Sequence, residues 1–172
     1  MSGDEYRPGK ERTLAVYPGG LKAGDRLRLK RDLQIRDHEG RETGEVLSAG
    51  PLWTVVHGLP DEPEVLWLHE PEGDLHTWSE PDAADAFDLV ASAPPPGAVV
   101  ALKIVPQWAA QLPEEGRELV RLCVGQPLRV VEIERNGLIV LDASIFDAAV
   151  GGSFNDLRVE AELVEPTPEH AA

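Results

Sequence analysis

One stretch of the chain concentrates side chains that can bind a cation. Between Glu42 and Leu102 the sequence contains no lysine or arginine but twelve aspartate and glutamate residues. Trp53, Trp67 and Trp78 lie in the same stretch. Carboxylates attract a basic group over about one Debye length, and an indole face adds cation–π energy on the order of 1 kcal/mol per contact. This composition predicts a binding surface for a basic protein or peptide segment.

Trp78 is the best candidate for an exposed ring at that surface, because its neighbours between His76 and Glu80 are polar. Trp53 and Trp67 lie in apolar runs, which favours packing in a core. The acidic residues that we expect to share the surface with Trp78 are Glu70, Glu72, Asp74, Glu80, Asp82 and Asp85.

The other reactive side chains form weaker patterns. His69 and His76 have carboxylates between them, but their spacing matches neither a helical metal motif nor a ligand pair on a strand, so we expect no metal. Cys123 lies between Leu122 and Val124, which predicts a small buried side chain and not a nucleophile. The sequence has no Gly-x-Ser-x-Gly elbow, phosphate-binding glycine loop or dinucleotide fingerprint. We therefore expect neither catalytic residues nor a cofactor.

Short strands must position these side chains, because 16 glycines and 15 prolines interrupt the chain too often for long helices. Alternating or β-branched runs predict strands at 25–30, 52–57, 64–68, 98–105, 128–134, 137–141 and 157–164. Turns are predicted at 38–40, 58–63 and 71–73. The Asn136-Gly137 pair predicts a hairpin with a type I′ turn, because both residues tolerate positive φ.

Two segments of the second half interrupt this strand pattern. Residues 106–124 contain Trp108, which is either a further partner contact or a plug at the end of the domain. In the same segment a helix is predicted to start at Pro113, with Leu119, Leu122 and Cys123 on its apolar side. Residues 142–156 carry three apolar side chains that form either an exposed patch or a satellite core, namely Ile145, Phe146 and Phe154.

The two halves of the chain match each other at an offset of about 74 residues. The matching segments are Gly24–Lys30 with Gly97–Lys103, Gly50–Val56 with Gly125–Val131, Val65–Leu68 with Ile139–Leu141, and Phe87–Val90 with Ala161–Val164. Each half reads strand, long irregular loop, strand, tight turn, strand, loop and final strand. This order predicts a mainly β protein built from two small β-barrels in tandem.

A unit with this order, opening with Gly24-Asp-Arg-Leu-Arg-Leu29, resembles the SH3-like barrel superfamily. The resemblance covers Gly20–Val90 and Pro96–Glu165 and rests on pattern, since the tyrosine-rich signatures of the eukaryotic SH3 peptide pocket are absent. It implies two SH3-like barrels and favours binding over catalysis. The expected domains are a partly disordered N-terminal arm (1–19), barrel 1 (20–90), a Pro-rich linker (91–96), barrel 2 (97–165) and a disordered tail (166–172).

The chain of 172 residues has a formal charge of −15, which argues against direct binding to nucleic acid. No apolar run reaches the roughly 18 residues of a membrane span, so we expect a cytoplasmic protein that does not bind membranes. The single cysteine excludes an internal disulfide. The expected oligomeric state is a monomer or a homodimer.

Three functions fit these observations, in decreasing order. The first is a non-catalytic protein-binding module whose acidic, Trp-bearing surface engages a basic partner, for example as an inhibitor or a bacterial-type immunity protein. The second is an acidic mimic of nucleic acid that blocks a DNA-binding protein. The third is an enzyme or accessory protein with a small-ligand pocket between the barrels, lined by His57, His69 or His76.

Overall fold

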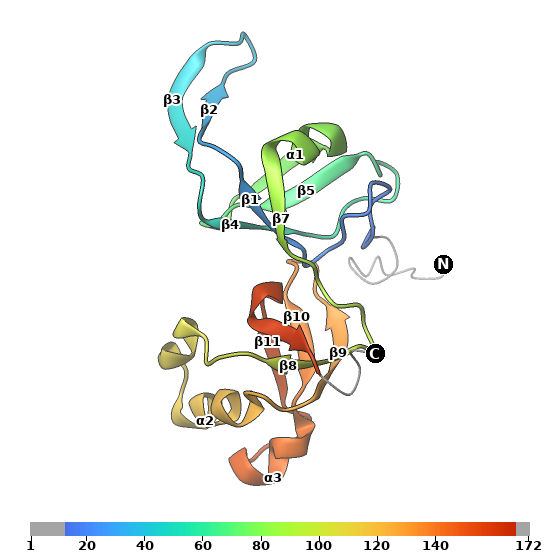
Figure 1. The fold of residues 1–172 in the computed structure, drawn as a ribbon, viewed down its shortest axis with the longest axis vertical. Helices are drawn as coiled ribbons and strands as arrows, with labels where there is room; N and C mark the ends of the chain where they lie inside the picture. Colours follow the sequence, from blue (N-terminus) through green and yellow to red (C-terminus); the bar gives the residue numbers. More distant parts are fainter. Residues whose placement is uncertain (1–12, 168–172) are drawn as a thin grey trace, which may run out of the picture.

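The chain folds into two β-rich units stacked along the long axis of the molecule, with a two-stranded arm projecting from the first unit (Figure 1). The computed structural model describes residues 13–167. Strands make up 38% of the described residues and helices 21%, which confirms the expected mainly β class. The disorder expected at the two ends falls largely on residues 1–12 and 168–172, outside the described part of the chain.

The first unit is a five-stranded antiparallel sheet with the strand order β6–β5–β4–β1–β7. Its strands are β1 (Arg26–Leu29), β4 (Leu52–Val55), β5 (Val65–His69), β6 (Leu75–Ser79) and β7 (Phe87–Ala91). Helix α1 (Glu80–Ala86) joins β6 to β7, and it starts at Ser79 because the Ser79 hydroxyl accepts the Asp82 N–H.

Alternating side chains of these strands build the first core. Leu27 and Leu29 of β1 are 2% exposed, and the core also contains Trp53, Val55, Leu66 and Leu68. Tyr17 joins this core, and its hydroxyl donates to the Val56 carbonyl at 2.7 Å. Residues 13–19, which the sequence had assigned to the N-terminal arm, therefore pack as part of the first unit.

The projecting arm is a hairpin of β2 (Leu33–Arg36) and β3 (Glu42–Leu47), which form a separate two-stranded sheet. The sequence had predicted a long irregular loop here. Five of the six residues of β3 are exposed, so this strand lacks the apolar alternation by which a half-buried strand is recognised.

The second unit repeats the strand order of the first, with β11–β10–β9–β8–β12 in the places of β6–β5–β4–β1–β7. Its strands are β8 (Val99–Leu102), β9 (Leu128–Ile133), β10 (Ile139–Asp142), β11 (Asp156–Val159) and β12 (Val164–Pro166). Where the first unit has its arm, the second has the 3-10 helix η1 (Gln107–Gln111) and helix α2 (Glu114–Cys123).

Helix α2 confirms the helix predicted after Pro113, and it buries Leu119, Val120 and Cys123 against the second core. The segment between β10 and β11 forms η2 (Ser144–Phe146) and helix α3 (Asp147–Val150), and η3 (Ala161–Leu163) precedes β12. Ile145 and Phe154 are exposed, whereas Phe146 packs on the core.

Within the described residues neither sheet closes on itself, so the expected barrels are not seen as closed structures. In the first unit, β6 and β7 are the edge strands of the sheet, and helix α1 connects them. The inserted helix separates the two edge strands, and each of them pairs with one neighbour only.

The hairpin predicted at Asn136-Gly137 is confirmed, since β9 and β10 pair antiparallel. The predicted type I′ turn is wrong. Gly137 has φ +85°, but Asn136 is not among the residues with positive φ, and the Gly137 N–H donates to the Glu134 carbonyl. The three-residue loop is a type I turn followed by one left-handed residue, which is the next most common solution for a hairpin.

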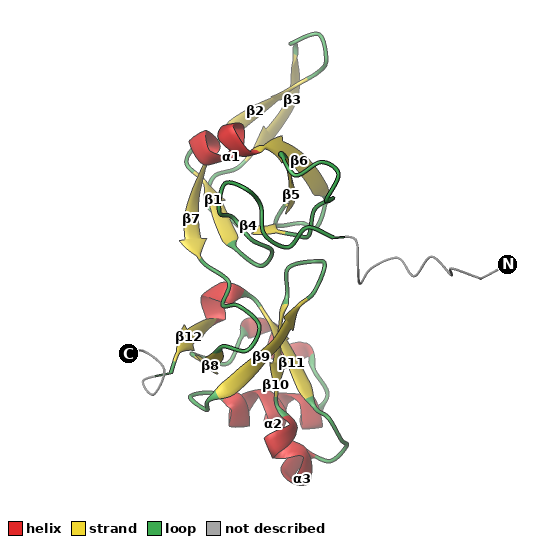
Figure 2. Cartoon of the chain, turned by 90° about the vertical axis from the view of Figure 1, so that its right-hand side faces the viewer, coloured by secondary structure: helices red, strands yellow, loops and turns green. Residues whose placement is uncertain are grey.

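Residues 92–98 connect the two units (Figure 2) and pack against both of them. Ala93 is 3% exposed and belongs to the second core. Its N–H donates to the buried Asp25 carboxylate at 2.8 Å, while Arg26 forms a two-pronged ion pair with Glu162 at 2.8 and 2.9 Å. Hydrogen bonds and charge pairs therefore hold the two units together.

Candidate functional site

Hairpin β5–β6 has two chemically different faces because successive side chains of a strand point to opposite sides. Leu66 and Leu68 lie in the core, and their cross-strand partners are Trp78 and His76. Trp67 and His69 point to the opposite face, across from Thr77 and Leu75. The predicted candidates on this hairpin are thus divided between two separate surfaces.

The face with His76 opens into a cleft of about 530 Å³ between the turn of this hairpin and the base of the arm. We call it the acidic cleft and define it by its four carboxylates and the two rings on its inner side. These residues are Glu45, Glu70, Glu72, Asp74, Trp53 and His76. None of the described residues that line it is a lysine or an arginine.

The β5–β6 turn holds three of the four carboxylates in place. The Glu70 N–H donates to the Asp74 carbonyl at 2.9 Å, and the Gly73 N–H donates to the Glu70 carbonyl at 3.0 Å. Gly73 takes φ +99°, which a glycine adopts without steric cost. The turn predicted at residues 71–73 therefore presents Glu70, Glu72 and Asp74 on one short loop.

Glu70 is the most enclosed of these acids, with 16% of its side chain exposed. Its Oε2 lies 3.1 Å from Nε2 of His76, whose side chain is 31% exposed. Glu72 and Asp74 are exposed. The cleft thus has a carboxylate–imidazole pair at its inner end and two carboxylates with access to a partner.

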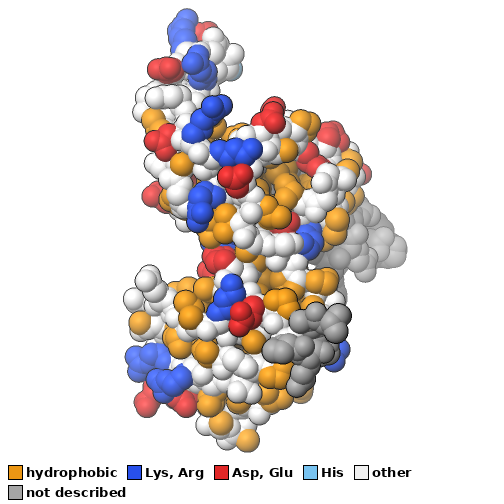
Figure 3. All heavy atoms as spheres, viewed as in Figure 1, with side chains coloured by type: hydrophobic (Ala, Val, Ile, Leu, Met, Phe, Trp, Pro, Cys, Tyr) orange, Lys and Arg blue, Asp and Glu red, His pale blue; other side chains and the backbone are white. Residues whose placement is uncertain are grey.

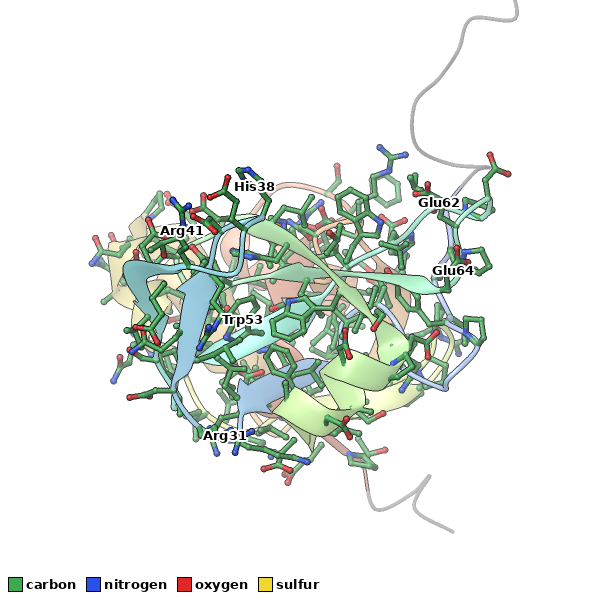
Figure 4. All side chains as sticks on the ribbon, turned by 90° about the horizontal axis from the view of Figure 1, so that it is seen from above. Arg31, His38, Arg41, Trp53, Glu62 and Glu64 are labelled. Atoms are coloured by element: carbon green, nitrogen blue, oxygen red, sulfur yellow. The ribbon has the colours of Figure 1, made fainter. Side chains whose placement is uncertain are left out.

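The aromatic rings form a packed cluster rather than a displayed surface. Trp53 is 1% exposed, and its ring meets those of Phe87 at 5.3 Å and His76 at 5.2 Å edge to face. Trp78, expected to be exposed, is half-buried and packs edge to face on Phe87 at 5.1 Å. Figure 4 shows Trp53 directed inward beneath the arm. The carboxylates, and not indole faces, are therefore the accessible groups of the acidic cleft.

The other predicted acids belong to helix α1 and do not line the cleft. Asp82 and Asp85 are exposed, and Asp85 lines a separate hollow with Lys30 and Arg31. Glu80 is partly buried near Gly19, and its Oε1 has no hydrogen-bond partner within residues 13–167. The structure therefore brings together Glu70, Glu72 and Asp74. The three acids of helix α1 lie outside the cleft.

Trp108 lies in the second unit, half-buried against the second core. Its Nε1–H donates to Glu160 Oε2 at 3.3 Å. The Trp108 ring is packed and its N–H is paired, which favours the plug at the end of the domain over an exposed partner contact.

Among the four carboxylates of the cleft, Glu45 of the arm is the one that the sequence did not predict for the site. It reaches the cleft because it lies in the half of β3 that is nearest the sheet, at the base of the arm. The turn expected at residues 38–40 was the one local signal for this hairpin, and it is present, with the Gly40 N–H donating to the Asp37 carbonyl. That Glu45 and Glu70 line the same cleft is seen only in the tertiary structure.

Basic side chains gather along the arm and the strand below it, on the face shown in Figure 3. Arg28, Lys30, Arg31, Arg36 and Arg41 are all exposed. Arg41 and Arg36 pair with carboxylates of the arm itself, at 2.8 Å to Glu39 and 3.6 Å to Glu42. The arginines of the arm are therefore paired within the hairpin, and the acidic cleft lies at its base.

Across residues 13–167, no three His, Cys, Asp or Glu side chains are close enough to hold one metal ion. The acids of the cleft are thus spread along its walls and do not converge on a point. Among the same residues, none of the helices has the length and apolar character needed to cross a membrane. Comparison with protein-family models, curated proteins and solved structures gives no match.

Proposed function

We propose that this protein is a non-catalytic binding module whose acidic cleft engages a basic segment of a partner protein. The observation that carries the proposal is the cleft of about 530 Å³, which within residues 13–167 is lined by four carboxylates and by no lysine or arginine. A hollow lined by one sign of charge focuses the field and raises the local concentration of an oppositely charged group.

The spread of the carboxylates favours arginine or lysine side chains over a metal ion. Several separated acids can each accept a hydrogen bond from a different basic side chain, and charge-assisted bonds are about twice as strong as neutral ones. Exposed pairs contribute only about 0–1 kcal/mol each, so affinity must come from several contacts made together. An extended basic segment meets that requirement.

An inhibitor or immunity protein held against a basic toxin or nuclease is the concrete form of this proposal. Acidic surfaces of that kind raise association rates and make them dependent on salt. Trp78 and Phe87 then act indirectly, because their packing holds β6 and the β5–β6 turn in position.

The test compares two double variants that remove the same charge. Glu72→Gln with Asp74→Asn alters the cleft, and Glu62→Gln with Glu64→Gln alters exposed acids that lie away from the arm (Figure 4). Binding of an acetylated hexa-arginine peptide is measured by calorimetry at low and high salt. We expect the cleft variant to weaken binding by about tenfold, equivalent to 1.4 kcal/mol, and the control to bind like the unaltered protein.

Equal weakening in both variants would show that peptide binding depends only on the overall charge. It would contradict the proposal that the acidic cleft is the binding site. A third variant, Asp82→Asn with Asp85→Asn, separates the cleft from the surface of helix α1. If that variant alone weakens binding, the partner contacts α1 instead. If the protein instead captures DNA-binding proteins from a lysate and added DNA displaces them, the nucleic-acid mimic is favoured.

We also propose that the two units are SH3-like domains that arose by internal duplication. Two features support this: the shared strand order, and the equivalent registers that pair Leu29 with Phe87 and Leu102 with Val164. By these registers, Phe87 of the first unit is equivalent to Val164 of the second. The sequence match had placed Phe87 over Ala161, three residues earlier. The arm and helix α2 are then alternative insertions at one site of the common unit.

A further inference from the structure

A second hollow lies at the contact between the two units, on the face of hairpin β5–β6 opposite the acidic cleft. It has a volume of about 370 Å³ and takes residues from both units. We call it the junction pocket and define it by its polar lining residues. These are Thr13, His57, Trp67, His69, Arg135 and Asn136.

The chemistry of this pocket is the reverse of that of the acidic cleft. Among the described residues, none that lines it is an aspartate or a glutamate. Arg135 supplies a guanidinium, which has donors only, and Asn136 supplies an amide. The Arg135 side chain is exposed and makes no ion pair with any residue that the structure describes.

One buried polar atom of a pocket residue has no partner among the described residues. Trp67 Nε1 is shielded from solvent and has no hydrogen-bond partner within residues 13–167. Buried polar atoms are nearly always paired, so such an atom calls for an explanation. A ligand bound against Trp67 is one explanation for an indole N–H that no described residue pairs.

The pocket is also held rigidly. The His57 N–H donates to the Arg135 carbonyl at 3.1 Å, and the His57 ring is fixed by Thr13 Oγ1, 2.8 Å from Nδ1. His69 Nδ1 donates to the Gly73 carbonyl at 2.9 Å. A site built in advance loses little conformational entropy when a ligand enters it.

We propose that the junction pocket binds a small carboxylate ligand with a planar apolar body. The carboxylate accepts hydrogen bonds from Arg135 and Asn136 at the mouth. The body lies against Trp67, Leu59 and Leu75, which supply the apolar lining. The volume lies in the range of sites for small ligands, which occur often between domains. This site is separate from the acidic cleft and does not depend on it.

Benzoate is the test ligand, and benzamide is its neutral counterpart of the same shape. Binding is followed in ¹H–¹⁵N correlation spectra by the indole N–H of Trp67 and the backbone amide of Asn136. Arg135→Gln removes the charge at the pocket, and its backbone carbonyl still accepts the His57 N–H. Arg117→Gln makes the same change at an exposed position of helix α2 and serves as the matched control.

We expect benzoate to shift both signals saturably, with a dissociation constant of about 1 mM, and benzamide to bind about tenfold more weakly. Arg135→Gln is expected to weaken benzoate binding about tenfold and Arg117→Gln to leave it unchanged. Equal binding of benzoate and benzamide, equal effects of the two arginine variants, or no saturable shift would each overturn the proposal. Binding of benzoate by the Glu72→Gln, Asp74→Asn variant stays normal if the two sites are independent.

Discussion

The side chain of Cys123 shows how burial alone determines the chemistry of a single residue. Helix α2 places it in the second core, where it is 0% exposed, as its apolar neighbours predicted. Burial raises the pKa of the Cys123 thiol to about 11. Because the thiolate is the reactive form, this cysteine is a packing residue and not a nucleophile.

Cys123 is therefore expected to react with a disulfide reagent such as DTNB only when the chain opens. At pH 8 the raised pKa alone lowers the thiolate fraction by about a hundredfold relative to an ordinary thiol. The measurement compares labelling rates of the native protein and of the protein in urea. Equal rates in the two states would contradict the buried position.

At the scale of elements, three hairpins of the molecule use the same turn. In each, the N–H of a glycine donates to the carbonyl three residues earlier, and the glycine has positive φ: Gly40 at +79°, Gly73 at +99° and Gly137 at +85°. Their surroundings differ, however. A Cβ at Gly73 would meet nothing within 4 Å, whereas one at Gly137 would lie 2.4 Å from Thr54 Cγ2 and 2.7 Å from the Val55 carbonyl.

Gly73→Ala and Gly137→Ala therefore form a matched pair of variants. Both introduce an alanine into a left-handed conformation, which costs about 1 kcal/mol. Gly137→Ala is expected to lose at least about 1 kcal/mol more, because its Cβ forces apart the contact between the two units. The measurement is the free energy of unfolding of each variant from urea titrations. Equal decreases in the two variants would show that the units do not meet at this turn.

At the scale of the whole molecule, the junction couples the stability of one unit to the other. Burial lowers the pKa of His57, and the positive charge of Arg135 from the second unit acts in the same direction, while the backbone of Ile133 and the charge of Glu132 oppose it. The folded protein thus holds His57 in the neutral form more strongly than the unfolded chain does.

The consequence is a dependence of stability on pH with a defined sign. The unfolded chain takes up a proton at His57 near the ordinary pKa of about 6.5, before the folded protein does. The contribution of His57 is complete above that pH and is lost as the pH falls through the lower folded-state value. His57→Gln is expected to flatten the fall of unfolding free energy in this range.

The measurement is the slope of unfolding free energy against pH, not its level, because His57→Gln also removes the bond to Thr13. His38→Gln makes the same change at a side chain that is 90% exposed, and it serves as the control. An unchanged slope in the His57 variant would mean that His57 is equally accessible to protons in the folded and unfolded states.

Local patterns in the sequence determined the mainly β class, three strands of the first half (β1, β4 and β5), four of the second (β8, β9, β10 and β11), the hairpin at Asn136-Gly137 and the helix after Pro113. Each of these depends on residues that lie within a few positions of one another. The burial of Trp53 and Cys123 followed in the same way from their apolar neighbours. The absence of lysine and arginine from Glu42 to Leu102 also identified the acidic part of the chain.

Only the tertiary structure decided which of those residues meet. Alternation along β5 shows that Trp67 and Leu68 face opposite ways, but both are apolar, so the pattern does not say which face is the core. The polar arm had no apolar alternation to reveal it, and its position in the fold is what places Glu45 in the same cleft as Glu70. The junction pocket likewise depends on contacts between residues about 80 positions apart, such as His57 with Arg135, which no local spacing encodes.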